Sequence, residues 1–420
     1  MKRFLLLASC LLSCLLTFAQ PGPEVEAYLR AFPQRAAFNT HAYEFLPLHD
    51  TPAPKGYKPF YISHYGRHGS RTDGTGKAMF SLDSLLSIAA TEGILTPAGD
   101  SLLGYAKRIT AVHGRMEGRL TDRGAREHTR LAERMFHRYP QVFKSGGAVY
   151  ALSSIVPRCL VSMSAFTSSL KACKKDIEIH WDCGEVYQKF ITRSYSREMK
   201  ERSHKLAWEV GPVVPYDTLA LYSRIFTDPE RGRRLFGKAK RLASYIYSTA
   251  AFAEAFDVND NLFRFLPWDY VTNRSSHSAL SAYLGHCNSV EFGDERIPRA
   301  GRLAGEMIRR ADEAIAGAPV AANLIFGHDW PFLGICSIFG LEGYGYPRMS
   351  AEEALYNWNG PLHCPFAANL QIIFYRNRKG GDILVKFLTN ERETPIPELT
   401  PVSGPYYRWN DVKEYVAHRQ

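Results

Sequence analysis

Residues 58–71 read KPFYISHYGRHGSR and join a β-rich run to a charged loop. The apolar residues between Lys58 and His64 predict a short buried strand, which Gly66 closes. The loop that follows, residues 67–71, carries two arginines and a histidine around a glycine. Glycine allows the backbone to come close to a bound group. This stretch therefore predicts a strand that ends in a binding loop, as at ligand sites of open α/β sheets.

Two later segments repeat this arrangement. Residues 149–155 and 322–326 read as strands; Arg158 follows the first, and His328 and Asp329 follow the second. The carboxyl ends of parallel strands meet at one edge of a sheet. The sequence therefore predicts one pocket that is shared by all three segments.

The rest of the pattern alternates strands with helices, which indicates an α/β fold. Helices are predicted at residues 77–91, 122–139 (with Thr121 as N-cap), 157–172, 299–316 and 331–339, a strand at 177–180, and a hairpin from 370–376 to 382–388. We expect a mostly parallel sheet flanked by helices.

The chain of 420 residues is long enough for one core with a substantial insertion. From about Cys183 to Asn288 the sequence becomes rich in Arg, Lys, Tyr and Phe, with helix-like stretches and little strand signal. We therefore expect residues 20–182 and 289–420 to form an α/β core domain. Residues 183–288 are expected to be a largely helical inserted second domain.

The first residues have the pattern of a secretory signal. Lys2 and Arg3 precede an apolar run that ends at Phe18, and Ala19 is a small residue at the expected cleavage position. We expect residues 1–19 to be a signal peptide and the protein to be exported, to a periplasmic or extracellular location. Lipidation at Cys10, giving an outer-membrane lipoprotein, is the alternative. Six cysteines follow the signal, so disulfides and buried free thiols are both open.

The composition is that of an ordinary globular protein, with 45% hydrophobic and 22% charged residues, and excludes a disordered or collagen-like chain. The formal net charge is +10, or +8 without Lys2 and Arg3. This positive charge favours an acidic partner. The sequence has no recognised nucleic-acid motif, so we expect no nucleic-acid partner. We also expect no stable membrane span, since the most apolar later stretch, residues 321–341, holds an ionisable pair and a proline.

The residues of the predicted pocket suit phosphate chemistry. Three guanidinium groups, those of Arg67, Arg71 and Arg158, offer planar donor forks that match phosphate oxygens. His68 is a candidate nucleophile, because neighbouring arginines lower the pKa of an imidazole and keep it neutral. Asp329 is a candidate proton donor to a departing oxygen, since a bound phosphate favours its protonated form.

These residues resemble the histidine acid phosphatases, the branch of the histidine phosphatase superfamily that includes phytases and multiple inositol polyphosphate phosphatases. The RHGxR signature of that family is matched by residues 67–71, and its HD element by residues 328–329. Three further segments are similar to its LTxxG segment, its Arg-bearing junction and its closing strands: residues 120–124 (LTDRG), 154–162 (SIVPRCLVS), and 365–370 with 388–390. The similarity spans roughly residues 58–172 and 298–392.

The resemblance implies a mechanism. His68 would attack the phosphate and form a phosphohistidine, Asp329 would protonate the leaving alcohol, and Arg67, Arg71, Arg158 and His328 would bind the phosphate oxygens. Neither a metal nor another cofactor is implied. Two departures concern the substrate: many inositol polyphosphate phosphatases carry HAE where this chain has HDW at 328–330, and Thr72-Asp73 replaces the aromatic-proline pair often seen after RHGxR.

Several functions remain open at this stage. The leading one is a phosphomonoester hydrolase acting on inositol phosphates such as phytate. A broad-specificity acid phosphatase acting on sugar phosphates, a phosphotransferase or mutase, and a non-catalytic phosphate-ester binding protein are the alternatives.

A basic cluster opens the predicted insertion. Its candidate contacts to the outer phosphates of a substrate are Lys189, Arg193 and Arg197, with a solvated helix face as the competing interpretation. Arg126 and His128 are expected to be solvated on their helix.

Overall fold

The computed structural model describes residues 21–191, 197–211 and 214–420. The described part of the chain contains an eight-stranded sheet in the order β3-β2-β4-β1-β5-β6-β7, with β8 paired to β6. The strands are β1 (Tyr57–Arg67), β2 (Ala148–Ser153), β3 (Ile179–Cys183), β4 (Val320–Gly327), β5 (Asn369–Asn377), β6 (Leu384–Thr389), β7 (Arg392–Glu393) and β8 (Tyr407–Arg408).

The sheet has a parallel half and an antiparallel half. Strands β3, β2, β4 and β1 run parallel to one another, whereas β5 pairs antiparallel with both β1 and β6. The hairpin predicted from β5 to β6 is therefore confirmed. Strand β4 is buried along nearly its whole length, as expected of a central parallel strand covered on both faces.

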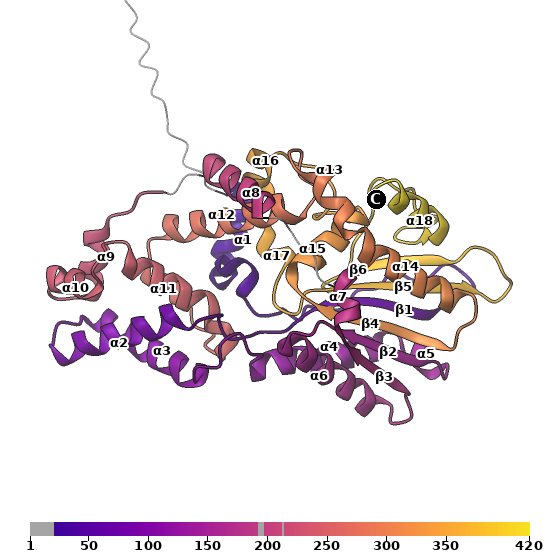
Figure 1. Ribbon diagram of the computed structural model, residues 1–420, viewed down its shortest axis with the longest axis horizontal. Helices are drawn as coiled ribbons and strands as arrows, with labels where there is room; N and C mark the ends of the chain where they lie inside the picture. The colour runs from indigo at the N-terminus through magenta and orange to yellow at the C-terminus, as the bar shows by residue number, and fades with distance from the viewer. Residues whose placement is uncertain (1–20, 192–196, 212–213) are drawn as a thin grey trace, which may run out of the picture.

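Helices cover both faces of the sheet (Figure 1). Helices α4 (Asp122–Arg138), α5 (Pro140–Lys144) and α6 (Pro157–Cys173) pack on one face through an apolar cluster that includes Leu131 and Phe166. Helices α14 (Gly301–Ile315), α15 (Asp329–Ile338) and α18 (Trp409–Ala417) pack on the other face. The predicted fold class, a mostly parallel sheet flanked by helices, is confirmed for its parallel core.

Helix α7 (Glu185–Ile191) lies beside the sheet, against α14 and β4 (Figure 1). Most of the remaining helices form a second body at the other end of the molecule or a bridge to it (Figure 1). The remaining helices are α1 (Pro23–Ala31), η1 (Pro33–Thr40), α2 (Lys77–Thr91), α3 (Pro97–His113), α8 (Arg197–Val210), α9 (Thr218–Ile225), α10 (Pro229–Phe236), α11 (Arg241–Phe252), η2 (Ala253–Phe256), η3 (Leu262–Phe265), α12 (Trp268–His286), α13 (Gly293–Arg296), η4 (Ile297–Ala300), α16 (Ala351–Asn357) and α17 (Gly360–His363).

The described residues of the predicted insertion, between β3 and α13, are helical or irregular, as expected. Their apolar core is shared, however, because one buried cluster joins α2 and α3 to α9, α10 and α11. Helices from the N-terminal part of the chain thus complete the helical body. The domain boundaries given above stay a prediction.

Local signals set several element ends correctly. Helix α2 begins at Lys77 and ends at Thr91 as predicted, and the Thr121 side chain accepts a hydrogen bond from Gly124 N as the N-cap of α4. Helix α15 begins two residues earlier than predicted, so that Asp329 lies in its first turn. The six cysteines are free thiols, which decides between the two alternatives left open by the sequence.

Candidate active site

Three strand ends converge beside one another, as the sequence predicts. Arg67, the last residue of β1, lies opposite Gly327 of β4, and the His68 amide donates to the Gly327 carbonyl at 3.0 Å. On the far side of β4, Ser154 N donates to the Phe326 carbonyl at 2.9 Å. The chain after β2 therefore enters α6 next to the same edge. The rings of His68 and His328 lie 5.6 Å apart, centroid to centroid.

The His68 imidazole is arranged as a nucleophile. It is 2% exposed, and its Nδ1 lies 2.9 Å from the Gly69 carbonyl. A carbonyl can only accept, so Nδ1 carries the proton and Nε2 keeps its lone pair. Burial lowers the pKa of His68 well below its ordinary value of 6.5, and the charges of Arg67 and Arg158 lower it further. The neutral imidazole is therefore favoured.

The loop is pressed against the start of α4. A Cβ at Gly69 would lie 2.4 Å from the Gly124 carbonyl oxygen, and one at Gly124 would lie 2.2 Å from the Ser70 carbonyl oxygen. Contacts so short exclude any side chain at either position. Gly69 N also donates to Ser162 Oγ at 3.1 Å, which ties the loop to α6. Both glycines are thus required by close backbone approach.

Glu127 on α4 binds the loop through hydrogen bonds. Its carboxylate is 3% exposed and accepts hydrogen bonds from Ser70 N and Ser70 Oγ, both at 2.7 Å, and from Tyr43 N at 3.1 Å. Burial raises the pKa of Glu127, against the lowering effect of these donors. The sequence analysis did not single out this residue.

The expectation for the neighbouring residues on α4 is half right. Arg126 is exposed and pairs with Asp257, whereas His128 is buried against Phe166 and Phe326, so its predicted solvation is wrong. The helix turns His128 toward the sheet, one residue beyond the inward-facing Glu127.

The Arg67 guanidinium is held in place by several contacts within the protein. Its Nη1 donates to three carbonyl oxygens, those of Asn39, Cys364 and Pro365, at 2.7 to 3.1 Å. Its Nη2 lies 3.1 Å from Asp329 Oδ2, and its guanidinium stacks over Phe366. Only the side of the guanidinium that bears Nη2 and Nε is left to meet a phosphate.

Arg71 and Arg158 are more available. Both are half-buried, and neither forms an ion pair with an acid within the ranges that the structure describes. Burial, together with the charges of Arg67 and Arg158, lowers the pKa of Arg71 to about 10. Clustered arginines that depress one another's protonation produce a strong positive field, which an anion would relieve.

His328 closes the pocket from β4. Its backbone N–H donates to the Tyr65 hydroxyl at 3.0 Å, and its Nε2 lies 3.3 Å from Ser154 Oγ. Burial lowers the pKa of His328 to about 4, with the Arg158 charge the next cause. His328 is therefore a neutral hydrogen-bonding group near pH 7.

Asp329 lies in the first turn of α15. Its Oδ2 accepts from Asn39 Nδ2 at 2.8 Å and from Arg67 Nη2, and its Oδ1 accepts from Trp330 N at 3.0 Å. These three donors fix the position of the carboxyl group. For Asp329 to deliver a proton, Arg67 must exchange this contact for a phosphate oxygen.

Asn39 is the second residue that the sequence analysis missed. It belongs to η1, where the preceding Phe38 adopts a positive φ of 56°. The segment supplies both the Asn39 side chain to Asp329 and the Asn39 carbonyl to Arg67. No motif in the sequence marks this contact, since the two partners of the side-chain bond are 290 residues apart.

The basic cluster of the insertion is exposed. Lys189 lies at the surface of α7, and Arg197 at the start of α8 pairs with Glu201. Arg193 lies outside the described residues. Their role as outer contacts stays a prediction.

Within the described ranges, no group of three or more His, Cys, Asp or Glu side chains is arranged to hold a metal ion. No helix in those ranges is long and apolar enough to cross a membrane.

Comparison with known proteins places this geometry in a known fold. No protein-family model matches the chain, and no curated protein sequence does so either. Among solved structures, the Bifidobacterium longum multiple inositol polyphosphate phosphatase in complex with phosphate superposes with a TM-score of 0.71 at 18% identity, over 91% of this chain and 97% of that one.

Two further structures agree. The complex of the same Bifidobacterium longum enzyme with inositol hexasulfate gives a TM-score of 0.67 at 18% identity, over 90% and 97% of the two chains. The phytase from D. castellii gives 0.67 at 13% identity, over 92% of this chain and 85% of that one. Across about nine-tenths of its length, the chain has the histidine acid phosphatase fold that is found in multiple inositol polyphosphate phosphatases and phytases.

Proposed function

We propose that this protein is a phosphomonoester hydrolase that works through a phosphohistidine on His68 and acts on inositol phosphates. The observation that carries the proposal is the neutral His68, with Nε2 free, beside two arginines that have no acid partner in the described residues. A phosphate monoester supplies the negative charge that these arginines lack.

In the first step, Nε2 of His68 attacks phosphorus in line with the ester oxygen. The N–P bond forms as the P–O bond to the alcohol breaks, and the proton of Asp329 passes to the departing oxygen. Arg67, Arg71 and Arg158 balance the charge on the three equatorial oxygens, and His328 adds a hydrogen bond. The products of this step are the free alcohol and phosphohistidine.

In the second step, water attacks the phosphohistidine. The carboxylate of Asp329 takes the proton from the water, the N–P bond breaks, and inorganic phosphate leaves with His68 neutral again. The proton that Asp329 lost in the first step is thereby returned. Each cycle consumes one ester and one water.

The bound phosphate itself prepares Asp329 for the first step. Arg67 Nη2 now donates to Oδ2 of Asp329, and a phosphate oxygen competes for the same donor. Loss of that hydrogen bond and the approach of a negative phosphate both favour the protonated carboxyl. Activity is therefore expected on the acid side, and a rate that rises steadily above pH 8 would contradict it.

The preferred substrate is proposed to be an inositol phosphate such as phytate. Support comes from the likeness to an inositol polyphosphate phosphatase whose structures hold phosphate and inositol hexasulfate, and from the net charge, which is +8 without Lys2 and Arg3. A broad-specificity acid phosphatase that prefers sugar phosphates is the second candidate. It is favoured by HDW at residues 328–330, where many inositol polyphosphate phosphatases carry HAE.

The test is phosphate release from phytate and from glucose phosphate by the chain without its first 19 residues, with no added metal. His68→Ala and Asp329→Asn are the comparison variants. We expect phytate to be turned over better than glucose phosphate, and both variants to lose turnover.

Preference for glucose phosphate would reject phytate as the preferred substrate but would agree with the proposed phosphohistidine mechanism. Absence of phosphate release would favour a non-catalytic binding protein, and transfer of the phosphoryl group to an added alcohol instead of water would favour a phosphotransferase.

We also propose that the protein is exported, with residues 1–19 as its signal peptide. These residues lie outside the described ranges, so the proposal rests on their sequence. N-terminal sequencing of the secreted chain tests it: an N-terminus at Gln20 is expected, and a lipid-modified Cys10 would reject it in favour of an outer-membrane lipoprotein.

A further inference from the structure

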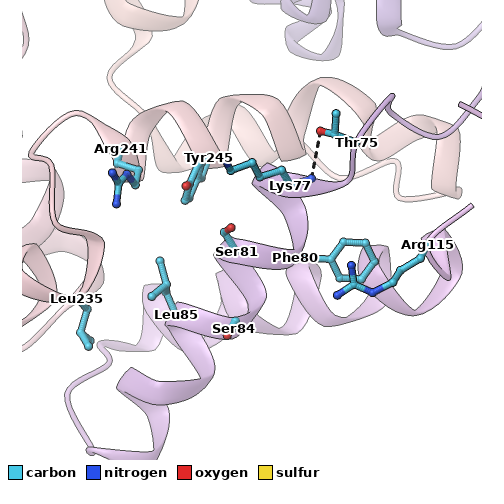
Figure 2. A pocket seen from close by; sticks show the side chains of 10 residues that line it. All are labelled: Thr75, Lys77, Phe80, Ser81, Ser84, Leu85, Arg115, Leu235, Arg241 and Tyr245. Atoms are coloured by element: carbon cyan, nitrogen blue, oxygen red, sulfur yellow. Dashed lines mark hydrogen bonds between the residues drawn. The ribbon is translucent and has the colours of Figure 1, made fainter. Parts of the chain in front are cut away.

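A second basic groove lies between α2 and α11, outside the candidate active site (Figure 2). Its volume is about 560 Å³. Lys77, Ser81 and Ser84 line it from α2, and Arg241 and Tyr245 from α11; Arg115 follows α3. None of the six candidate catalytic and phosphate-binding residues lines it.

The cations of this groove lack acidic partners. Lys77, Arg115 and Arg241 form no ion pair with any carboxylate in the described part of the chain. Other arginines of the same region are paired: Arg231 with Glu92, and Arg233 with Glu230. Neutralisation by local acids is thus available nearby but is absent in the groove, so three positive charges face solvent there.

The guanidinium groups of Arg115 and Arg241 are each held in place by one contact within the protein. Arg241 Nη1 donates to the Phe236 carbonyl at 2.7 Å, which leaves its other donors free. The Arg115 guanidinium stacks over the Phe80 ring at 4.3 Å from the centroid, as Figure 2 shows. Stacking of this kind fixes the plane of a guanidinium while its edge donors stay available.

Hydroxyl groups lie between these cations. Ser81 and Ser84 are three residues apart and so share one face of α2, and Tyr245 faces them from α11 (Figure 2). Guanidinium, ammonium and hydroxyl donors around an open space are the set that binds phosphate oxygens.

A neighbouring cavity shares part of its lining with the groove. This cavity of about 400 Å³ has Thr75, Lys77 and Tyr245 in common with the groove. It is also lined by Asn39, whose side chain donates to Asp329, and by Phe252, over which the Arg71 guanidinium stacks. The groove is therefore one cavity away from residues that contact the candidate active site.

We propose that the groove between α2 and α11 is a second binding site for a small molecule that carries several phosphate groups. It binds one such molecule while the catalytic pocket holds another, and so keeps substrate near the entrance. This binding needs no hydrolysis and does not depend on the proposed catalytic function.

The test is calorimetric titration of the His68→Ala chain with inositol hexakisphosphate, which that chain is expected not to consume. We expect two binding events. Arg115→Gln with Arg241→Gln, added to the same chain, should remove one event or weaken it at least about tenfold, because each arginine supplies charge-assisted hydrogen bonds. Added salt should weaken the same event.

Arg234→Gln is the matched control, because this arginine is exposed on α10 and does not line the groove. It should keep both events. Turnover of a small ester by the double variant with His68 intact should match that of the unsubstituted chain. Inorganic phosphate is titrated separately, because a groove event of equal strength with phosphate alone would overturn the choice of a multiply phosphorylated ligand.

Arg158→Gln distinguishes this inference from the proposed function. A single event that the double variant abolishes and Arg158→Gln leaves intact supports the groove and counts against substrate binding in the catalytic pocket. A single event that Arg158→Gln abolishes and the double variant leaves intact overturns the groove. If the double variant fails to fold by circular dichroism, the single Arg115→Gln and Arg241→Gln variants decide in the same way.

Discussion

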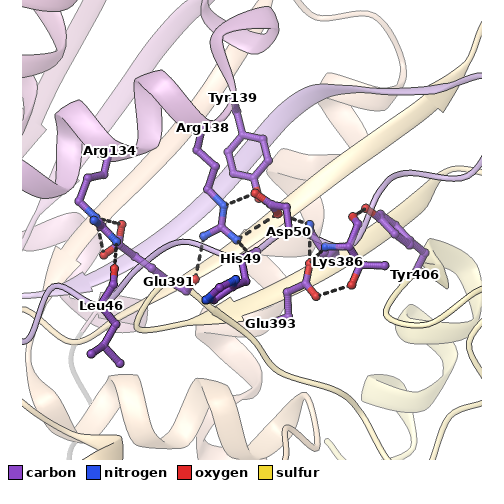
Figure 3. A network of polar contacts seen from close by, with 11 residues as sticks. Leu46, His49, Asp50, Arg134, Arg138, Tyr139, Lys386, Glu391, Glu393 and Tyr406 are labelled. Atoms are coloured by element: carbon purple, nitrogen blue, oxygen red, sulfur yellow. Dashed lines mark hydrogen bonds and ion pairs between the residues drawn. The ribbon is translucent and has the colours of Figure 1, made fainter.

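The two ends of helix α4 contact two clusters of charged side chains that differ in balance. Its first turns support the loop of residues 67–71 through Glu127, in a cluster of three arginines and two acids, Glu127 and Asp329. Its last turns enter the polar network of Figure 3, where Arg134, Arg138 and Lys386 face Asp50, Glu391 and Glu393. Cations exceed acids at the first end and equal them at the second.

The balanced network ties distant segments together. Arg138 binds Asp50 and the His49 and Glu391 carbonyls, and Arg134 binds Glu391 and the Leu46 carbonyl. Lys386, whose side chain is 1% exposed, binds Asp50 and Glu393. The network thereby fastens the segment around residues 46–51 to α4 and to the antiparallel edge of the sheet (Figure 3).

In this molecule, the balance between cations and acids in a cluster of side chains indicates whether the cluster is structural or binds a ligand. Where each cation has its acid, the charges are satisfied within the fold and their role is structural. Where cations stay in excess, as at the loop of residues 67–71 and in the groove between α2 and α11, we propose that a ligand supplies the missing negative charge.

Acid should weaken the fold first through buried histidines. Burial lowers to about 3 the pKa of four of them: His41, His64, His128 and His363. Each stays neutral in the folded chain but takes up a proton in the unfolded chain below about pH 6.5. Stability is therefore full above pH 6.5, and each histidine subtracts about 1.4 kcal/mol for each pH unit below it.

Denaturant unfolding at pH 7.5, 6.5 and 5.5 measures this effect. The unfolding free energy should fall by several kcal/mol between pH 6.5 and 5.5, and by a smaller amount from 7.5 to 6.5. If it does, stability and not chemistry limits the activity at low pH. A value that is flat or rises toward pH 5.5 would contradict the neutral buried histidines.

Glu127→Ala should have the next largest effect, a loss of activity. It leaves the Ser70 and Tyr43 amides without their acceptor and frees the loop that carries His68. We expect kcat/KM for phytate to fall about 100-fold, equivalent to about 3 kcal/mol. Glu127→Gln keeps one acceptor oxygen and should recover most of the activity; equal losses for both variants would mean that the charge of Glu127, and not its hydrogen bonds, supports the loop.

Lys386→Ala should break the balanced network without affecting the chemistry. Asp50 and Glu393 lose their shared partner, at a cost of about 2 kcal/mol, below the value for a fully buried pair because both carboxylates reach solvent. Thermal unfolding at pH 7 measures the loss, and kcat of the folded variant should stay unchanged. Lys413→Ala, which removes the more exposed partner of Asp312, is the control with a smaller expected loss.

This loss should disappear in strong acid. Burial raises the pKa of Asp50 and of Glu393, but hydrogen bonds from Arg138 and Lys386 to Asp50 and from Lys386 to Glu393 outweigh it, so both pKa values are lowered. A lowered carboxylate pKa stabilises the fold above the ordinary values near 4 and ceases to do so as pH falls through the lowered values. The unfolding free energies of the unsubstituted and Lys386→Ala chains should therefore converge as the pH falls below about 4; a constant difference would reject the pairing.

Asn39→Ala tests the hydrogen bond to Asp329. Without this donor the position of the carboxyl group is less defined. We expect kcat to fall about tenfold, or about 1.4 kcal/mol. Gln34→Ala, which removes another amide of η1 whose partner is the Asn259 carbonyl, should leave kcat unchanged; an unchanged kcat in Asn39→Ala would contradict a role for this hydrogen bond in positioning Asp329.

The smallest effect is expected in the insertion. Lys189→Gln and Arg197→Gln should each raise KM for phytate about twofold, with no change for glucose phosphate, because exposed charges are screened. Steady-state kinetics at low and at 0.3 M salt measures this. No change at either salt concentration would leave the groove between α2 and α11 as the better place to look for contacts to outer phosphates.

Much of the candidate site could be predicted because its signals are local. The loop of residues 67–71 and the pair at 328–329 each follow an apolar run, and Arg158 follows Pro157 at a helix start. Runs of apolar residues predict buried strands, and ligand sites lie at the strand ends. The same reasoning failed for His128, since the charged residues around it hide the face of α4 that turns inward.

Taken alone, the sequence determined the fold class, the strand ends that meet and the residue types suited to phosphate, because each depends on patterns a few residues long. Only the tertiary structure brought Asn39 to Asp329, Glu127 to Ser70 and Lys386 to Asp50, and showed which cations keep no partner. These contacts join residues 57 to 336 positions apart. Their partners are chosen by the packing of the whole chain, which leaves no local pattern to read.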